Sequence, residues 1–211
     1  MSANLQPRIT VMTADDHAVL RDGVATLIAG QPDMIVVGEA ASGAEAIERY
    51  RELRPDLTIV DLHMPDGNGI EVIRAIRSES SDARFIVLTT YTGDVHALRA
   101  LRAGAAAYLL KSMLRTELID TIRAVHAGQR RVPAEIAVQI ALNAPDGELT
   151  DREIDILRCV AEGFANKRIA TELSISLETV KAHMKSILAK LRAEDRTHAV
   201  TIALRRGVFD L

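Results

Sequence analysis

Residues 57–67, LTIVDLHMPDG, are the stretch of sequence that decides the fold. A short apolar run ends in Asp61 and is followed at once by turn-forming residues, as at the carboxyl end of a buried strand. The first apolar run of the chain, residues 9–14, ends in the same way at Asp15 and Asp16. Three carboxylates at the ends of two strands predict one acidic pocket.

The alternation of short apolar runs with longer amphipathic segments continues over residues 8–128. It predicts a parallel sheet with helices on both faces. Ligands of such sheets bind beyond the carboxyl ends of the strands, where the strand order reverses, and Thr89 and Lys111 also fall at strand ends. The expected strands are 8–14, 34–40, 56–61, 84–89 and 105–110, and the expected helices are 17–30, 43–54, 68–78, 94–103 and 114–127.

The composition excludes several classes of protein. Aromatic residues make up 3% of the 211 residues and Trp is absent, which argues against a base-stacking surface for single strands. Cys159 is the only cysteine, so an intramolecular disulfide and a four-cysteine zinc site are excluded, and we expect an inert core thiol. No apolar run is long enough to span a membrane and no signal pattern opens the chain, so we expect a cytoplasmic protein.

The net charge of -3 conceals two unlike parts of the chain. Residues 149–211 hold 11 Lys and Arg against 9 Asp and Glu, whereas the preceding residues hold 15 against 20. A polyanionic partner would therefore belong to the second part. We expect one domain over 1–128, a linker over 129–148 and a second domain over 149–211. Within these, a short helix is expected at 134–142 and further helices at 150–162, 166–173, 177–192 and 196–206.

The loop after the first strand decides the chemistry of the first domain. A nucleotide site would need a glycine-rich loop there, but Asp15, Asp16 and His17 would repel a phosphate unless a cation intervened. Carboxylate oxygens suit Mg²⁺ instead. With such an ion bound, Asp61 can attack a phosphoryl group, while Lys111 and Thr89 offer a charge and a hydroxyl to its oxygens. Each of these residues alone is more often a structural feature of a strand end.

Four short motifs resemble those of the receiver domain of two-component response regulators: ADDH at 14–17, VDLHMP at 60–65, LTTY at 88–91 and YLLK at 108–111. The resemblance implies that Asp61 accepts a phosphoryl group from a sensor histidine kinase. It also implies a switch formed by Thr89 and Tyr108. Many receivers have Pro after the lysine, whereas this chain has Ser112, which leaves the isomer of the Lys111–Ser112 bond open. The metal ligands that the resemblance implies for Mg²⁺ are Asp15, Asp16, Asp61 and the backbone carbonyl of His63.

The helix expected at 177–192 has two unlike faces. Its apolar face carries Val180, Met184, Ile187, Leu188 and Leu191, as a helix packed on its own core requires. The short turn at 174–176 before it is typical of a helix-turn-helix. The opposite face places small residues beside lysines, which permits close approach to DNA, although a solvated basic face would look the same. Its members are Lys181, Ala182, Lys185, Ser186 and Ala189.

The second domain also resembles the LuxR/NarL-type helix-turn-helix, through LTDRE at 149–153, GFANKRIA at 163–170 and ISLETVKAH at 175–183. The resemblance implies double-stranded promoter DNA as a partner and a homodimer on paired half-sites. Glu153 would be a structural cap or ion-pair partner. The last helix either pairs with a second subunit or belongs to the core, with Val200, Ala203 and Leu204 as its apolar residues. Lys181, Ala182 and Lys185 would face the major groove, and Asn166, Lys167, Thr179 and Lys190 would contact phosphates.

The whole sequence predicts an α/β receiver with a five-stranded, doubly wound, flavodoxin-like sheet, followed by a small all-α domain of four helices. The predicted function is that of a DNA-binding transcriptional response regulator and not of an enzyme. Two alternatives stay open. One is an aspartyl-phosphate hydrolase, which is disfavoured because His63 stands where a second catalytic acid would be needed. The other is a regulator that binds DNA without phosphorylation. The sequence does not choose between dimerisation and release of the recognition helix as the switch.

Overall fold

The computed structural model describes residues 7–90, 93–143 and 149–209. The chain folds into two compact units, whose main parts are the residues up to Pro133 and those from Ala134 onward.

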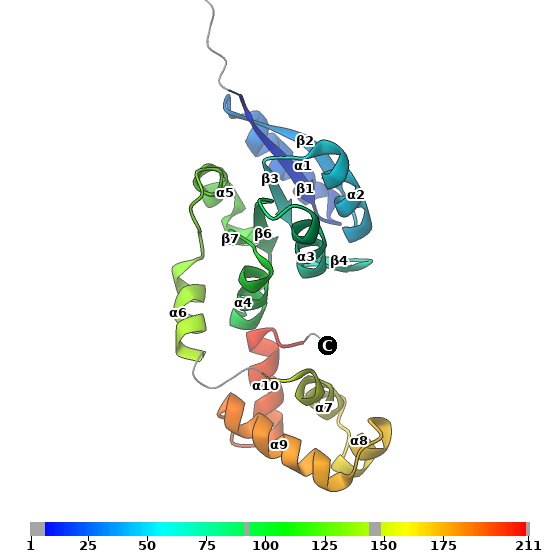
Figure 1. Cartoon of the computed structure of the whole chain (residues 1–211). Coiled ribbons are helices and arrows are strands. Elements are labelled where there is room, and N and C mark those ends of the chain that lie inside the picture. The colour runs from blue at the N-terminus through cyan, green and yellow to red at the C-terminus, as the bar shows by residue number, and fades with distance from the viewer. Residues whose placement is uncertain (1–6, 91–92, 144–148, 210–211) are drawn as a thin grey trace, which may run out of the picture. The chain divides into compact units, whose positions relative to one another are not determined.

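The first unit is built on five parallel strands in the order β2-β1-β3-β6-β7 (Figure 1). The residues of β3, β6 and β7 are all buried, because helices cover both faces of the sheet, whereas most residues of the edge strand β2 are half-buried. The expected strands are confirmed to within two residues at each end. The strands are β1 (Ile9–Ala14), β2 (Met34–Ala40), β3 (Leu57–Val60), β6 (Phe85–Thr89) and β7 (Ala107–Leu110).

The strand order reverses at β1, which lies between β2 and β3. Ala14 at the end of β1 is paired with Val60 at the end of β3. The residues that follow these two, Asp15 and Asp61, therefore leave adjacent strands at the same edge of the sheet. This edge is where an open α/β sheet places its ligands.

Helices α1 and α5 cover one face of this sheet and enclose a core that includes Val24, Ile28 and Ile122. Helices α2 and α3 pack against each other. A two-stranded hairpin that the sequence did not predict, β4 (His63–Met64) and β5 (Gly67–Asn68), follows Asp61. The remaining elements are α1 (Ala18–Ala29), α2 (Gly43–Leu53), α3 (Gly69–Glu79), α4 (Asp94–Ala103), the 3₁₀ turn Lys111–Met113 and α5 (Leu114–His126).

The second unit is helical, as expected. Its core includes Cys159, a free buried thiol whose pKa is raised by burial, in agreement with an inert role. The predicted capping box is present, since Thr150 accepts from the backbone N–H of Glu153 and Glu153 reaches back to Thr150. The helices are α6 (Ala134–Asn143), α7 (Asp151–Ala161), α8 (Asn166–Glu172), α9 (Leu177–Leu191) and α10 (Arg196–Arg206).

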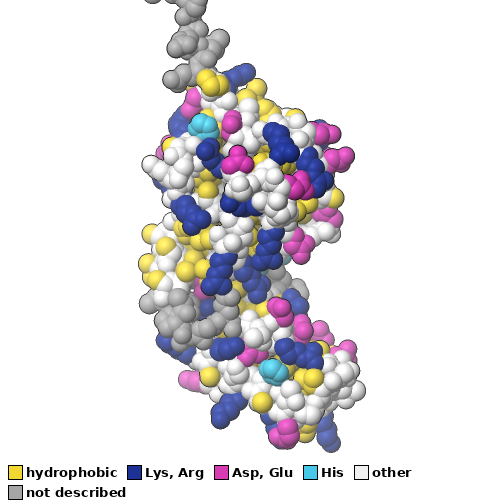
Figure 2. All heavy atoms as spheres, viewed as in Figure 1, with side chains coloured by type: hydrophobic (Ala, Val, Ile, Leu, Met, Phe, Trp, Pro, Cys, Tyr) yellow, Lys and Arg dark blue, Asp and Glu magenta, His cyan; other side chains and the backbone are white. Residues whose placement is uncertain are grey.

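The surface mixes charges of both signs. On the face that it presents, Figure 2 shows Lys and Arg side chains interspersed with Asp and Glu. Among the described residues, no helix combines the length and apolar character needed to cross a membrane.

Candidate functional site

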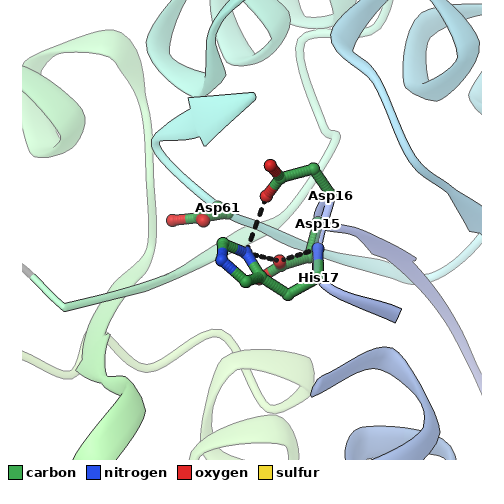
Figure 3. Close-up of side chains that lie close together, drawn as sticks. All are labelled: Asp15, Asp16, His17 and Asp61. Atoms are coloured by element: carbon green, nitrogen blue, oxygen red, sulfur yellow. Dashed lines mark hydrogen bonds and ion pairs between the residues drawn. The ribbon is translucent and has the colours of Figure 1, made fainter. Parts of the chain in front are cut away.

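The acidic pocket predicted from the sequence is formed at the edge of the sheet. Asp15 and Asp61 are 4% and 3% exposed, whereas Asp16 lies at the surface. Figure 3 shows these three carboxylates and the ring of His17 converging from the two strand ends. One ligand atom of each of the four residues lies within 4.8 Å of those of the others. The pocket therefore brings together donors that one divalent cation can bridge.

Lys111 joins the two buried carboxylates. Its Nζ lies 2.8 Å from Oδ2 of Asp15 and 2.7 Å from Oδ2 of Asp61. Burial disfavours the charged form of Lys111, but its contacts with Asp15 and Asp61 outweigh this and raise its pKa above the ordinary value. The residue is therefore a fixed positive charge at the strand ends.

The carboxyl of Asp61 experiences opposing influences. Burial raises its pKa most strongly, Lys111 lowers it, and the neighbouring charge of Asp15 raises it again, with the net pKa above the ordinary value. A single lysine thus compensates two buried carboxylates only in part. Oxygen donors with excess negative charge are what a hard cation such as Mg²⁺ binds, so the donor set fits that ion.

The backbone of the pocket is held by Arg21, a residue that the sequence analysis missed. Its Nη1 donates to the carbonyl of Asp15 at 2.6 Å, and its Nε lies 3.2 Å from Oε2 of Glu39 on β2. The guanidinium therefore ties the loop after β1 to the neighbouring strand. An arginine one helical turn inside the helix that follows an acidic loop was the available signal, but its direction depends on tertiary packing.

Gly69 permits the close approach of α3 to the acceptor. A Cβ at this position would lie 2.0 Å from the backbone oxygen of Asp61, a distance that no side chain tolerates. Asp66, in the turn of the β4–β5 hairpin, accepts from the backbone N–H groups of Gly43 and Ala44 at 2.7 and 2.8 Å. These contacts fix the segment that follows Asp61 on both sides.

The remaining predicted receiver residues lie at or behind the pocket. Thr89 ends β6 and Tyr108 lies on β7, and both side chains are buried. The His63 side chain is exposed on β4, and the peptide bond between Lys111 and Ser112 is trans. A hollow of about 760 Å³ above Asp61 is lined by residues that include His17, Val19, Leu20, His63 and Lys111.

In the second unit, the two faces of α9 are as predicted except at Ser186, whose hydroxyl donates to the buried Glu153. Val180, Met184, Ile187 and Leu191 are buried and Leu188 packs against the same core. Lys181, Ala182 and Lys185 are exposed on the other face, and Nζ of Lys181 lies 2.8 Å from Oε1 of Glu178. The first residues of α8, Asn166 and Lys167, are half-buried and exposed, and the half-buried Thr179 donates its backbone N–H to Ser176.

Lys190 differs from the other predicted phosphate contacts. Its Nζ lies 2.7 Å from Oε2 of Glu153, a carboxylate that is 3% exposed. Glu153 also accepts from the hydroxyl of Ser186 at 2.6 Å and from the backbone N–H of Thr150 at 2.7 Å. Burial opposes the charge of Glu153, but Lys190, Ser186 and Thr150 lower its pKa to about 2. The network ties the start of α7 to α9, and Glu153 fills both of the roles between which the sequence left a choice, structural cap and ion-pair partner.

The apolar residues of α10 mostly face inward. Ala203 is fully buried in the core of the second unit, and Val200 and Leu204 are partly buried against it. Of the two roles considered for these residues, the core role holds for Ala203.

The chain is similar to known proteins over both of its units. Residues 11–123 match the family model of the response regulator receiver domain, and residues 147–203 match that of bacterial regulatory proteins of the luxR family. The chain is 40% identical to the transcriptional regulatory protein LiaR of Bacillus subtilis, over 96% of this chain and 100% of LiaR. It is 36% identical to the response regulator protein VraR of Staphylococcus aureus, over 95% of this chain and 99% of VraR.

Solved structures agree with the sequence matches. RcsB from Salmonella enterica serovar Typhimurium, bound to promoter P1flhDC in the presence of phosphomimetic BeF3⁻, is similar at a TM-score of 0.73 and 27% identity. The similarity covers 92% of this chain and 97% of RcsB. It therefore extends over both units and not over the sheet alone.

Proposed function

Because this chain belongs to the NarL/LuxR class of response regulators, which are DNA-binding transcriptional regulators and not enzymes, we propose that Asp61 is its phosphoacceptor. The observation that carries this proposal is the Asp61 carboxylate itself. It is buried at the point where the strand order reverses, beside Asp15 and 2.7 Å from Nζ of Lys111. Phosphorylation of this residue would control binding to promoter DNA.

The metal that assists this chemistry is Mg²⁺. Asp15, Asp16 and Asp61 would hold it through carboxylate oxygens, together with the backbone carbonyl of His63. When bound, the ion neutralises charge on the transferring phosphoryl oxygens. The hydrogen bonds of Arg21 to the Asp15 carbonyl and of Asp66 to α2 support this role, because they hold the ligand-bearing loops in place before the ion arrives.

In the transfer step, a carboxylate oxygen of Asp61 forms a bond to phosphorus as the bond from phosphorus to the kinase histidine nitrogen breaks. Lys111 is placed to pair with the phosphoryl oxygens, because its Nζ already contacts the attacking carboxylate. Thr89, at the end of the neighbouring β6, would donate its hydroxyl to the phosphoryl group. Tyr108, on the next strand, is already buried and would hold the inward position behind Thr89.

The sensor kinase would dock over the hollow beside Asp61. Val19 on α1 is 85% exposed and lines this hollow together with Leu20 and His17. An exposed apolar side chain beside a reactive carboxylate is suited to a partner that must bring a phosphohistidine to that carboxylate and then leave.

DNA would be bound by α9, with Lys181, Ala182 and Lys185 in the major groove. Asn166, Lys167 and Thr179 would contact phosphates at the starts of the two helices of the motif. Lys190 is kept among the proposed phosphate contacts, although its pair with Glu153 reduces the charge that it can offer. Two copies of such a helix are needed for useful specificity, so the active form would be a homodimer.

A measurement of DNA affinity with and without phosphorylation tests the proposal. Wild type and Asp61→Asn are compared by fluorescence anisotropy on promoter fragments enriched from the genome of the source organism, with Mg²⁺ and phosphoramidate present. The wild type should bind at least about ten-fold more tightly after treatment, which corresponds to 1.4 kcal/mol, and the variant should not respond.

The same samples separate the two open routes of switching. Sedimentation velocity without DNA should show a phosphorylation-dependent dimer if dimerisation drives binding, and an unchanged monomer if release of α9 does. An affinity that is equally high in wild type and Asp61→Asn, with or without phosphodonor, would favour the regulator that acts without phosphorylation. Continuous release of inorganic phosphate from a small ester would favour the hydrolase.

A further inference from the structure

The ring of His17 closes one side of the acidic pocket (Figure 3). Its Nδ1 lies 2.7 Å from Oδ1 of Asp16 and 3.1 Å from Oδ1 of Asp15. One ligand atom each from Asp15, Asp16, His17 and Asp61 lies within 4.8 Å of those of the others. A nitrogen donor is therefore part of the same cluster as the three carboxylates that Mg²⁺ would use.

The backbone fixes His17 at this place. Its N–H donates to Oδ1 of Asp15 at 2.8 Å, and its carbonyl accepts from the N–H groups of Leu20 and Arg21 in the first turn of α1. The residue is the N-cap of α1, so its position relative to Asp15 is set by the start of a helix and not by a free loop. The ring itself is 66% exposed and borders the hollow above Asp61, so an ion can reach it from solvent.

The pocket offers an imidazole nitrogen in addition to the carboxylate oxygens that Mg²⁺ binds. Magnesium prefers oxygen ligands and keeps several waters, whereas an imidazole nitrogen suits zinc, nickel and copper. An ion that gains a nitrogen ligand here gains affinity that Mg²⁺ does not.

We propose that His17, with Asp15, Asp16 and Asp61, makes the pocket a site for a divalent transition ion such as Zn²⁺, which competes with Mg²⁺. The inference rests on the proposed Mg²⁺ site. Four side-chain ligands satisfy the usual coordination number of zinc, which leaves no open position for a phosphoryl oxygen. The occupant ion would therefore hold the receiver in a state that does not accept a phosphoryl group.

Isothermal titration calorimetry of the full-length protein with zinc chloride and with magnesium chloride tests the inference. The variants are His17→Asn, Asp61→Asn and, as a control for loss of an exposed imidazole elsewhere, His126→Asn. Asparagine is a favourable N-cap residue, so His17→Asn is expected to keep α1 folded, which circular dichroism checks. We expect His17→Asn to weaken Zn²⁺ binding at least about ten-fold and to change Mg²⁺ affinity less than about two-fold. His126→Asn should change neither affinity, and Asp61→Asn should weaken both.

A competition experiment adds a second readout. Excess Mg²⁺ should weaken the apparent affinity of wild type for Zn²⁺, because both ions use Asp61. The inference would be overturned if wild type and His17→Asn bound Zn²⁺ with equal affinity, or if Asp61→Asn bound Zn²⁺ as tightly as wild type. In either case, Mg²⁺ binding by wild type would still support the proposed function. Absence of Mg²⁺ binding in wild type would instead remove the metal site on which both depend.

Discussion

Two buried carboxylate–lysine pairs, one in each unit, have the same length and opposite character. Asp61 and Lys111 approach to 2.7 Å in the receiver, and Glu153 and Lys190 approach to 2.7 Å in the DNA-binding unit. Yet the pKa of Asp61 is raised, whereas that of Glu153 is lowered to about 2. The distance from the lysine therefore does not determine whether the pKa of the carboxylate is raised or lowered.

The surroundings of each carboxylate explain the difference. Both carboxylates are 3% exposed, but Asp61 shares its lysine with Asp15, whose charge raises the pKa of Asp61. Glu153 accepts from Thr150 and Ser186 in addition to Lys190, and none of the largest influences on its pKa is a neighbouring carboxylate. Hydrogen bonds to the charged form outweigh burial in the second case and not in the first. In the receiver, the charged form of Asp61 is therefore destabilised and its carboxylate is available for chemistry. In the DNA-binding unit, the charged form of Glu153 is stabilised and holds α9 in place.

Removal of each carboxylate should have opposite effects on stability. Glu153→Ala should lower the free energy of unfolding of the second unit by about 3 to 5 kcal/mol, because it leaves Lys190 without its buried partner and removes the capping box. Asp61→Asn should leave the first unit as stable as before or stabilise it by about 1 kcal/mol, since a neutral side chain no longer faces Asp15. Hydrogen exchange measured on peptides from each unit distinguishes these effects.

The control for this comparison is Glu153→Gln, which keeps the size of the side chain and loses the charge. It should cost less than Glu153→Ala. If Asp61→Asn destabilised the first unit as much as Glu153→Ala destabilised the second, the two carboxylates would not differ in their effect on stability and the prediction would be wrong.

The pH dependence of the two units should also differ in sign. The lowered pKa of Glu153 means that its stabilisation is fully present above the ordinary pKa of glutamate, near 4.5, and is lost as the pH falls towards 2. A shift of this size corresponds to roughly 3 kcal/mol. The raised pKa of Asp61 means that its destabilising charge is present at neutral pH and is relieved as the pH falls through that pKa.

Urea unfolding of wild type and Glu153→Gln, followed by NMR signals of α9 amides between about pH 6 and pH 3, measures the first of these effects. The wild type should lose stability over this range. The variant should lose less, because the group that takes up the proton is gone. Parallel curves would show that Glu153 is not the group responsible.

A smaller effect concerns the two lysines of α9. Lys185→Met should lower the slope of log affinity against log salt by about one, as expected when one phosphate contact is lost. Lys190→Met should lower it by less, because Nζ of Lys190 is already paired with Glu153. Anisotropy titrations at several salt concentrations give both slopes, and equal changes would place Lys190 on a phosphate.

Sequence alone predicted most of the fold and the reactive end of the pocket. Strand ends are visible in the sequence as apolar runs stopped by Asp15, Asp61 and Lys111, so their convergence followed from the parallel sheet. The contacts of Arg21 with the Asp15 carbonyl and of Lys190 with Glu153 were not predicted, because each depends on which way a long side chain turns after packing. The place of His17 against two carboxylates has the same origin.

One measurement tests directly whether Asp61 is the phosphoacceptor of the receiver. Wild type, Asp61→Asn and Glu153→Gln are incubated with phosphoramidate and Mg²⁺, and their intact masses and peptides are measured. We expect one phosphoryl group on the peptide that carries Asp61 in wild type and in Glu153→Gln, and none in Asp61→Asn. Equal phosphoryl uptake by Asp61→Asn, or none by wild type, would contradict the claim that Asp61 is the phosphoacceptor.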